Sequence, residues 1–227
     1  MNTAILIPAR YNSSRFPGKP LQILGSKTMV ETVAEKCSES GLPVYILTDD
    51  TRIVENVDKT YNVIYDEAPY DNGTERCMGA LSNPMLDKYD FFINVQGDMP
   101  DISSEIINSV YKKMISDYRI VTAYTDIKDG PQKNDTNSVK IIVTKNNVRW
   151  FGRGFKYGYH HLGIYGYSRH NLEVYGKRQT EYENLEQLEQ LRWFERGVEI
   201  SAVKVDFDGV EINTPEDIKK WNAKNNK

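Results

Sequence analysis

Three cationic side chains lie on one short polar segment near the N-terminus. Arg10, Arg15 and Lys19 follow the apolar run TAILIPA (residues 3–9), in a stretch that also holds prolines and a glycine. Guanidinium and ammonium groups gathered on one loop can surround a polyphosphate, because each supplies charged hydrogen-bond donors to its oxygens. Most charge clusters are only solvated surface, so the segment is either an anion site or a basic loop in water.

A carboxylate suited to a metal ion follows a second apolar run. Asp98 comes directly after FFINVQG (residues 91–97). Mg²⁺ needs only one or two protein carboxylates when water and phosphate oxygens complete its shell. Asp98 taken alone fits equally well as an acid near the N-terminus of the helix that follows it. Its expected place beside the cationic segment favours the metal-binding interpretation.

Composition excludes several other classes of protein. The 227 residues carry a formal net charge of -3, so no broad basic face is available for nucleic acid. Cys37 and Cys77 form no C-x-x-C pattern, which argues against a disulfide framework or thiolate metal site and fits a reducing compartment. No signal peptide pattern follows Met1, and no apolar run reaches the ~20 residues of a membrane span. We therefore expect a soluble, cytoplasmic protein without nucleic-acid or membrane partners.

These side chains need elements to position them, and the first half of the chain alternates strands with helices. Apolar runs predict strands over residues 3–9, 43–50, 62–66 and 89–98. Helical spacing and end signals predict helices over 28–41, 52–61, a stretch from about 73, and 103–117. This alternation predicts an α/β fold with a Rossmann-like, mostly parallel sheet. Ligands bind beyond the carboxyl ends of such strands, which selects the segments PARYNSSRFPGKP, TDD and QGDMP.

The second half follows a different pattern. Residues 137–154 predict two strands around an Asn-Asn turn, and residues 160–168 predict another strand, as an antiparallel excursion of the sheet. Residues 180–197 predict one long helix with a capping box, Thr180 and Glu183. A strand over 199–205 and a last helix opening at NTPEDIKKW (213–221) complete the chain.

Several long motifs, in order along almost the whole chain, resemble those of the CMP-Kdo synthetases, the 3-deoxy-manno-octulosonate (Kdo) cytidylyltransferases. The motifs are IPARYNSSRFPGKPL, LTDD, NGTER, NVQGDMP, HLGIYGY, LEQLR and NTPEDI. The resemblance implies a nucleotide-diphospho-sugar transferase-like fold and a homodimer that acts in lipopolysaccharide biosynthesis. It also implies transfer of CMP from CTP, with Mg²⁺, to the anomeric hydroxyl of an acidic 2-keto sugar. We expect a single cytidylyltransferase domain over 1–227, with a nucleotide-binding half (1–125) and a sugar-binding, candidate dimer half (126–227).

The resemblance assigns roles to particular residues. Arg10, Lys19 and Asp98 are expected to be catalytic. The residues expected at the triphosphate are Arg10, Arg15 and Lys19. Those expected at the cytosine and ribose are Ala9, Gly73, Thr74 and Gln96, with Arg76 nearby as a further nucleotide-binding residue. The residues expected at the sugar are Arg153, His161, Tyr165, Glu189 and Gln190, and those at Mg²⁺ are Asp98 and Asn213. Spacing alone would make Tyr165 a strand aromatic and Glu189 and Gln190 a solvated helix face, but their motif positions favour the sugar.

The implied chemistry explains why cations gather on one loop. CTP brings about four negative charges, and preorganised donors stabilise the charge that grows on its phosphates during transfer. The anomeric hydroxyl attacks the α-phosphorus in line with departing pyrophosphate, so no nucleophilic side chain is needed. Catalysis then consists of positioning together with metal and cation electrostatics.

The sequence departs from the family pattern at three places. Asn213 stands where the family has a metal-binding aspartate, and Met99 stands where it has an acid. Only GFKYGYH separates Arg153 from His161, where the family has a much longer segment. Two alternatives follow: a cytidylyltransferase for a different acidic sugar, or a nucleotide-binding homologue with weak or no turnover. In an extended segment Glu211 would point to the same side as Asn213 and could supply the missing charge.

Overall fold

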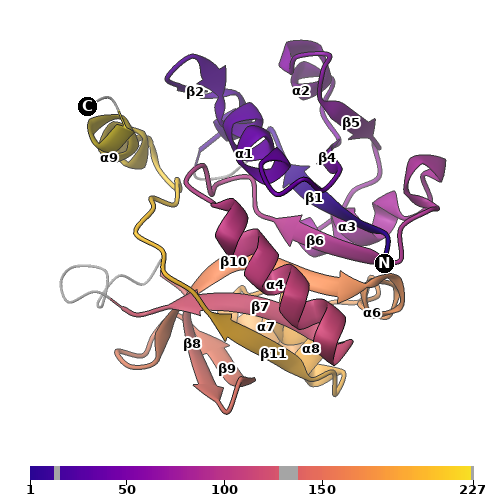
Figure 1. Cartoon of the computed structure of the whole chain (residues 1–227), viewed down its shortest axis with the longest axis vertical. Coiled ribbons are helices and arrows are strands. Elements are labelled where there is room, and N and C mark those ends of the chain that lie inside the picture. The colour runs from indigo at the N-terminus through magenta and orange to yellow at the C-terminus, as the bar shows by residue number, and fades with distance from the viewer. Residues whose placement is uncertain (13–15, 128–137, 226–227) are drawn as a thin grey trace.

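Alternate side chains of the first strand, β1 (Thr3–Ala9), are buried on opposite faces of one sheet. Ile5 and Ile7 face one hydrophobic cluster, while Ala4 and Leu6 face the other. A strand buried on both faces is typical of a parallel sheet covered by helices. The computed structural model, which describes residues 1–12, 16–127 and 138–225, has this arrangement (Figure 1).

The main sheet is mixed and has the strand order β5-β4-β1-β6-β10-β7-β11-β9-β8. The other strands span β4 Val44–Thr48, β5 Asn62–Tyr65, β6 Phe91–Val95, β7 Ile120–Thr125, β8 Lys140–Thr144, β9 Asn147–Gly152, β10 Tyr159–Ser168 and β11 Ile200–Lys204. Neighbours among β5, β4, β1 and β6 are parallel, as are β7 and β11, whereas β10 runs antiparallel between β6 and β7. The predicted mostly parallel sheet with an antiparallel excursion is therefore confirmed.

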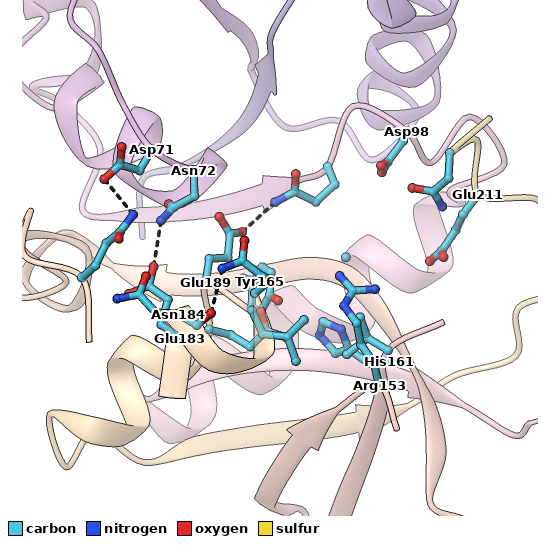
Figure 2. A pocket seen from close by; sticks show the side chains of 18 residues that line it. Asp71, Asn72, Asp98, Arg153, His161, Tyr165, Glu183, Asn184, Glu189 and Glu211 are labelled. Atoms are coloured by element: carbon cyan, nitrogen blue, oxygen red, sulfur yellow. Dashed lines mark hydrogen bonds between the residues drawn. The ribbon is translucent and has the colours of Figure 1, made fainter. Parts of the chain in front are cut away.

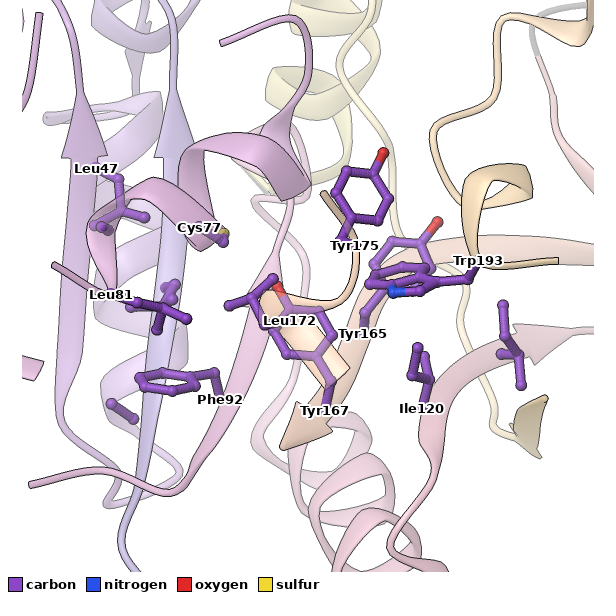
Figure 3. Packing of buried hydrophobic residues seen from close by; sticks show 14 of the residues in the cluster. Leu47, Cys77, Leu81, Phe92, Ile120, Tyr165, Tyr167, Leu172, Tyr175 and Trp193 are labelled. Atoms are coloured by element: carbon purple, nitrogen blue, oxygen red, sulfur yellow. The ribbon is translucent and has the colours of Figure 1, made fainter. Parts of the chain in front are cut away.

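Helices cover both faces of this sheet (Figure 1). Their bounds are α1 Met29–Ser38, α2 Thr51–Asn56, α3 Gly73–Ala80, α4 Ser104–Asp117, α6 Arg169–Glu173, α7 Glu181–Glu186, α8 Leu191–Glu195 and α9 Pro215–Asn225. Short elements are η1 Lys19–Leu21, β2 Ile23–Leu24, β3 Lys27–Thr28 and η2 Pro84–Leu86. Helices α1 and α4 pack on one face, and α3, α6 and α8 supply side chains such as Cys77, Leu172 and Trp193 to the cluster on the other (Figure 3).

Helix starts follow the local signals. Thr28 and Glu31 form a reciprocal capping box at α1, and the Ser103 hydroxyl caps α4. A serine or threonine at this position satisfies backbone N–H groups that have no partner inside the helix. Helix α1 ends at Ser38, before the expected stop at Gly41, which adopts a φ of 78°.

The long helix predicted over residues 180–197 is wrong. The chain forms two short helices, α7 and α8, separated at Gln187, which takes a left-handed φ of 54°. The Leu188 amide donates to the Glu183 carbonyl (3.2 Å), which closes α7 in the manner of a Schellman end. Leu188 and Leu191 are buried, whereas Leu185, which a continuous helix would place on the same apolar side, is 71% exposed. The break turns residues 189 and 190 toward the interior.

The predicted hairpin in the second half is confirmed with a shifted turn. Strands β8 and β9 pair antiparallel, and the turn residues with positive φ are Lys145 and Asn146, so Asn147 already belongs to β9. Strand β8 also pairs with the start of β10.

The end of the chain returns to the first half of the molecule. The Ile212 amide donates to the Asp98 carbonyl (2.9 Å), and the Ile212 side chain packs with Phe16, Leu24 and Trp221. In Figure 1, α9 lies near β2, although the two elements are far apart in the sequence. The division into halves at residue 125 remains a prediction, and residues 212–225 contact the first of those halves.

Within residues 1–12, 16–127 and 138–225, no helix has both the length and the apolar character needed to span a bilayer.

Candidate active site

A polar cavity of about 350 Å³ lies where the two parts of the sheet meet. Figure 2 shows Asp71, Asn72 and Asp98 entering it from the first half of the chain, opposite Arg153 and His161 from the second. Its other lining residues are Gln96, Val139, Gly163, Tyr165, Gln179, Glu183, Asn184, Gln187, Leu188, Glu189, Gln190, Glu211 and Asn213. The cavity opens beyond the carboxyl end of β6, as the rule for such sheets predicts.

Lys19 joins three segments at one end of this cavity. Its Nζ donates to Asp98 Oδ2 (3.0 Å) and to the Ile212 carbonyl (3.1 Å). The loop after β1, the loop after β6 and the segment before α9 therefore meet at one ammonium group. Helix α4 begins at Ser104, so Asp98 lies outside its first turn, and the interpretation of Asp98 as a helix-terminal acid is wrong.

Oxygen donors suited to Mg²⁺ gather beside this ammonium. Asp98, Asn213 and Glu211 all line the cavity, as expected of residues 211 and 213, but the Glu211 carboxylate is turned toward His160. Among the residues that the structure describes, no three His, Cys, Asp or Glu side chains form a self-sufficient metal site. This donor set fits a Mg²⁺ ion that takes one or two protein oxygens and the remainder from phosphates and water.

Two arginines, the half-buried Arg10 and the fully buried Arg76, lie near the carboxyl ends of β1 and β4. Arg10 Nη1 donates to the Asp71 carbonyl (2.8 Å), and Arg76 Nη2 donates to Asp49 Oδ2 (2.5 Å). Burial, together with the like charge of Arg76, lowers the pKa of Arg10. Within the described residues, Arg10 Nη2 and both Arg76 Nε and Nη1 are buried without a hydrogen-bond partner. Buried donors in this state are costly unless a ligand accepts from them, which suits an anionic or carbonyl-bearing ligand.

The N-terminus of α3 lies against Gln96 and Glu189. Glu189 accepts from the Thr74 amide (3.2 Å) and from Gln96 Nε2 (3.0 Å). Burial raises the pKa of Glu189, and the Thr74 amide and the Arg10 charge oppose that rise. A Cβ at Gly73 would lie 3.1 Å from Gln96 Nε2 and from the Pro8 ring, so glycine permits this close approach. The break at Gln187 allows a residue of the 187–190 turn to reach α3.

Strand β10 carries the aromatic residues of the opposite wall. His161 Nε2 shares a hydrogen bond with Thr122 Oγ1 (2.9 Å), and its ring lies edge-on to Phe151 and near Tyr165. Burial, with the nearby charges of His160 and Arg153, lowers the pKa of His161 to about 3. The ring is therefore neutral at neutral pH and offers hydrogen bonds without a positive charge. Arg153 also lines this wall and carries a positive charge.

Most residues predicted for the site lie at the cavity or directly behind it. Gln96, Asp98, Asn213 and the five predicted sugar residues line it, while Lys19, Gly73 and Thr74 contact lining residues. Ala9 ends β1 and is buried beside Arg10. Arg15 lies outside the described residues. The individual roles of these residues remain predictions.

Sequence reasoning missed the polar network behind the cavity. Arg192 is fully buried and holds Glu75 and Glu183, and Arg76 is paired with Asp49. Three of the motifs, LTDD, NGTER and LEQLR, contain Asp49, Glu75 and Arg192, but no spacing rule indicates that acids in one motif pair with an arginine in another. Burial of charged side chains is visible only once the helices are packed.

Comparison with known proteins shows which family and which fold the chain resembles. The sequence model of a family described as Cytidylyltransferase matches residues 4–200. A relative from Shewanella pealeana, named 8-amino-3,8-dideoxy-manno-octulosonate cytidylyltransferase, is 39% identical over 236 residues, covering 96% of each chain. A solved CMP:2-keto-3-deoxy-manno-octonic acid synthetase complexed with CTP is 30% identical with a TM-score of 0.88, covering 98% of each chain. A UDP-glucose pyrophosphorylase complexed with UDP-glucose, 13% identical with a TM-score of 0.75 over 99% of this chain and 98% of that one, shares the fold.

Proposed function

The chain belongs to the cytidylyltransferase family, and on that premise we propose that it transfers CMP from CTP to the anomeric hydroxyl of Kdo or a Kdo-like sugar, releasing pyrophosphate. The single observation that carries the proposal is the meeting of Lys19, Asp98 and the segment before α9 at one end of a polar cavity. The opposite wall supplies Arg153 and a neutral His161 for an acidic sugar. Such a cavity would hold a triphosphate and a sugar acid side by side.

Each side of the cavity has a distinct task in this reaction. Lys19 and Arg10 donate to the phosphates and stabilise the negative charge of the departing pyrophosphate. Gln96 and the N-terminus of α3 hold the cytidine, and Arg153 holds the sugar carboxylate opposite them. The sugar hydroxyl oxygen bonds to the α-phosphorus and gives up its proton to water, while the bond from that phosphorus to the oxygen that bridges it to the β-phosphorus breaks and pyrophosphate leaves with that oxygen. Holding both reactants in line supplies much of the rate enhancement.

We further propose that Mg²⁺ is the cofactor. Asp98 would hold it, with the Asn213 amide oxygen near, and Lys19 would exchange its bond to Asp98 for one to a phosphate. The ion would neutralise charge on the triphosphate oxygens. Glu211 Oε1 lies 3.5 Å from His160 Nε2 and so belongs to the β10 wall.

Pyrophosphate release is the experiment that tests this function. CTP and Mg²⁺ are incubated with a panel that contains Kdo, 8-amino-3,8-dideoxy-manno-octulosonate and other keto-sugar acids. Release with Kdo or its 8-amino derivative is expected. Release only with an unrelated acidic sugar would favour the different-sugar alternative, and CTP binding without release from any sugar would favour the nucleotide-binding homologue suggested by Asn213 and Met99.

Loss of a sugar contact should separate sugar kinetics from CTP binding. We expect His161→Asn and Gln190→Ala each to raise the sugar KM or lower kcat by about tenfold or more, because hydrogen bonds to a charged ligand contribute about 1.5–3 kcal/mol. CTP affinity should stay within about twofold, roughly 0.4 kcal/mol. Steady-state kinetics and calorimetry measure these effects, with the exposed His170→Asn as the matched control. An equal loss of CTP affinity would mean that the assignment is wrong.

Two substitutions test how the metal end is charged. Because Glu211 is turned toward His160, we expect Asp98 and the phosphates to hold Mg²⁺ largely alone. Asn213→Asp should then lower the Mg²⁺ concentration for half-maximal activity by roughly threefold or more, since a carboxylate binds Mg²⁺ better than an amide does. Glu211→Gln should change it by less than about twofold, a small free-energy difference. If Glu211→Gln changes the Mg²⁺ requirement and Asn213→Asp does not, Glu211 is the missing carboxylate. If neither substitution changes it, residues 211 to 213 do not bind the metal ion.

We also propose that the chain acts as a homodimer in the cytoplasm, in lipopolysaccharide biosynthesis. The support is the family resemblance, and light scattering of the purified protein at micromolar concentration tests the assembly. A monomer mass would remove the dimer from the account and leave the reaction untouched.

A further inference from the structure

A buried arginine ties together three helices behind the cavity. Arg192 on α8 donates from Nη1 to Glu75 Oε1 on α3 (2.5 Å). Its Nε and Nη2 donate to the two carboxylate oxygens of Glu183 on α7 (2.6 Å each). The guanidinium is fully buried and also donates to the Gly176 carbonyl (2.7 Å). A forked donor that meets two carboxylates at once fixes their relative orientation, which an ammonium group cannot do.

One branch of this network leads to the nucleotide side of the cavity. The other oxygen of Glu75 accepts from the Asp71 amide (2.9 Å), just before α3. Asn72 caps α3 by accepting from the Glu75 amide (2.9 Å), and its Nδ2 donates to Glu183 Oε1 (3.2 Å). The residues that precede Gly73 are therefore held through both partners of Arg192.

A second branch leads to the sugar side. The Tyr175 ring lies 4.2 Å from the Arg192 guanidinium, and the Tyr175 hydroxyl donates to the Glu189 carbonyl (3.0 Å). Asn72 Nδ2 donates to the same hydroxyl (3.0 Å). One tyrosine thus connects the α3 cap to the turn that presents Glu189 and Gln190. Arg192 itself does not line the cavity within the described residues.

From these contacts we propose that Arg192 is a positioning residue for CMP transfer. It holds the 187–190 turn against the N-terminus of α3, so that Glu189 bridges the nucleotide and sugar sides in one fixed geometry. A buried ion triad adds little stability over apolar packing of the same volume, so the charges are better explained by the orientation that they impose. The inference rests on the proposed function and adds to it a residue that acts through Glu189.

A double-mutant cycle in kcat/KM tests this role. Arg192→Met and Glu189→Gln are each expected to lower kcat/KM for the sugar by about 10²-fold, the scale on which misplaced groups act. Because Arg192 acts through Glu189, the double variant should be no more than about threefold worse than the poorer single variant. If the fold-losses in kcat/KM of the two single variants multiply in the double variant, Arg192 does not act through Glu189. Its role would then be stability alone, and the proposal would be overturned.

Matched variants separate positioning from folding. Arg169 on α6 also donates to backbone carbonyls, those of Leu86 (2.6 Å) and Tyr89 (3.1 Å), away from the cavity. Arg169→Met should lower Tm and leave kcat/KM near wild type. In the double variant with Glu189→Gln, the fold-changes in kcat/KM of the two single variants should multiply. If Arg192→Met does not fold, Arg192→Lys replaces it in the cycle and should show intermediate kcat/KM with the same non-additivity. Wild-type turnover is measured first: its absence with every sugar overturns function and positioning together, whereas multiplying effects in an active enzyme overturn positioning alone.

Discussion

Asp98→Asn is expected to lower kcat by at least about 10²-fold, the loss seen when one group that stabilises transition-state charge is removed. Asp98 Oδ2 lies 3.0 Å from Lys19 Nζ at the end of the cavity proposed to hold the phosphates, and Asp98 is the carboxylate proposed to hold Mg²⁺. The amide keeps the shape of the side chain and removes its charge. It also removes repulsion of the triphosphate, so CTP affinity without Mg²⁺ should be unchanged or higher.

The measurement combines pyrophosphate release at saturating Mg²⁺ with calorimetric CTP titrations in the presence and absence of the ion. The exposed Asp87→Asn is the control and should behave as wild type. A threefold change in kcat corresponds to well under 1 kcal/mol in the activation free energy. If kcat of Asp98→Asn stays within about threefold of wild type, Asp98 has no part in catalysis.

Lys19→Ala should weaken binding of CTP, UTP and ATP alike, by about 10- to 100-fold, because a charged hydrogen bond contributes about 1.5–3 kcal/mol. The ammonium is held by Asp98 and the Ile212 carbonyl, and not by the α3 residues proposed to select the base. The preference for cytosine should therefore stay the same. Calorimetry with the three nucleotides measures both effects.

Lys27→Ala provides the matched control, since Lys27 is an exposed lysine paired with Glu35. Thermal unfolding of Lys19→Ala checks that the three joined segments remain folded. Unaltered triphosphate affinity would mean that Lys19 only joins Asp98 to the Ile212 carbonyl and does not bind the phosphates. A selective loss of CTP would place it at the base instead of the phosphates.

The sheet was predictable because its signals are local. A strand buried on both faces must be apolar throughout, as TAILIPA is, and Thr28 and Ser103 mark their helices through hydrogen bonds within a few residues. The carboxyl ends of β1, β4 and β6 then bring Arg10, Asp49 and Asp98 to one edge of the sheet. The end of the cavity at which Mg²⁺ is proposed to bind follows from this geometry once the strand order is known.

The break at Gln187 was not predictable from spacing. LEQLEQL has the periodicity of a continuous amphipathic helix. A glutamine in the left-handed conformation is unfavourable, and no neighbouring residue in the sequence indicates that it is stabilised there. Contacts distant in the sequence favour the break, because Glu189 reaches the Thr74 amide and Gln96 only when α7 ends early. The motif resemblance assigned Glu189 and Gln190 to the sugar without showing how the chain turns them inward.

The most direct test of the central claim is a ³¹P NMR spectrum of the protein with CTP, Mg²⁺ and Kdo or its 8-amino derivative. The proposed function predicts that the three CTP resonances are replaced by a pyrophosphate resonance and one phosphodiester resonance of the CMP-sugar. The two products should form in equal molar amounts, and only when the sugar is present. Unchanged CTP with every sugar, or CMP and pyrophosphate formed without any sugar, would contradict it.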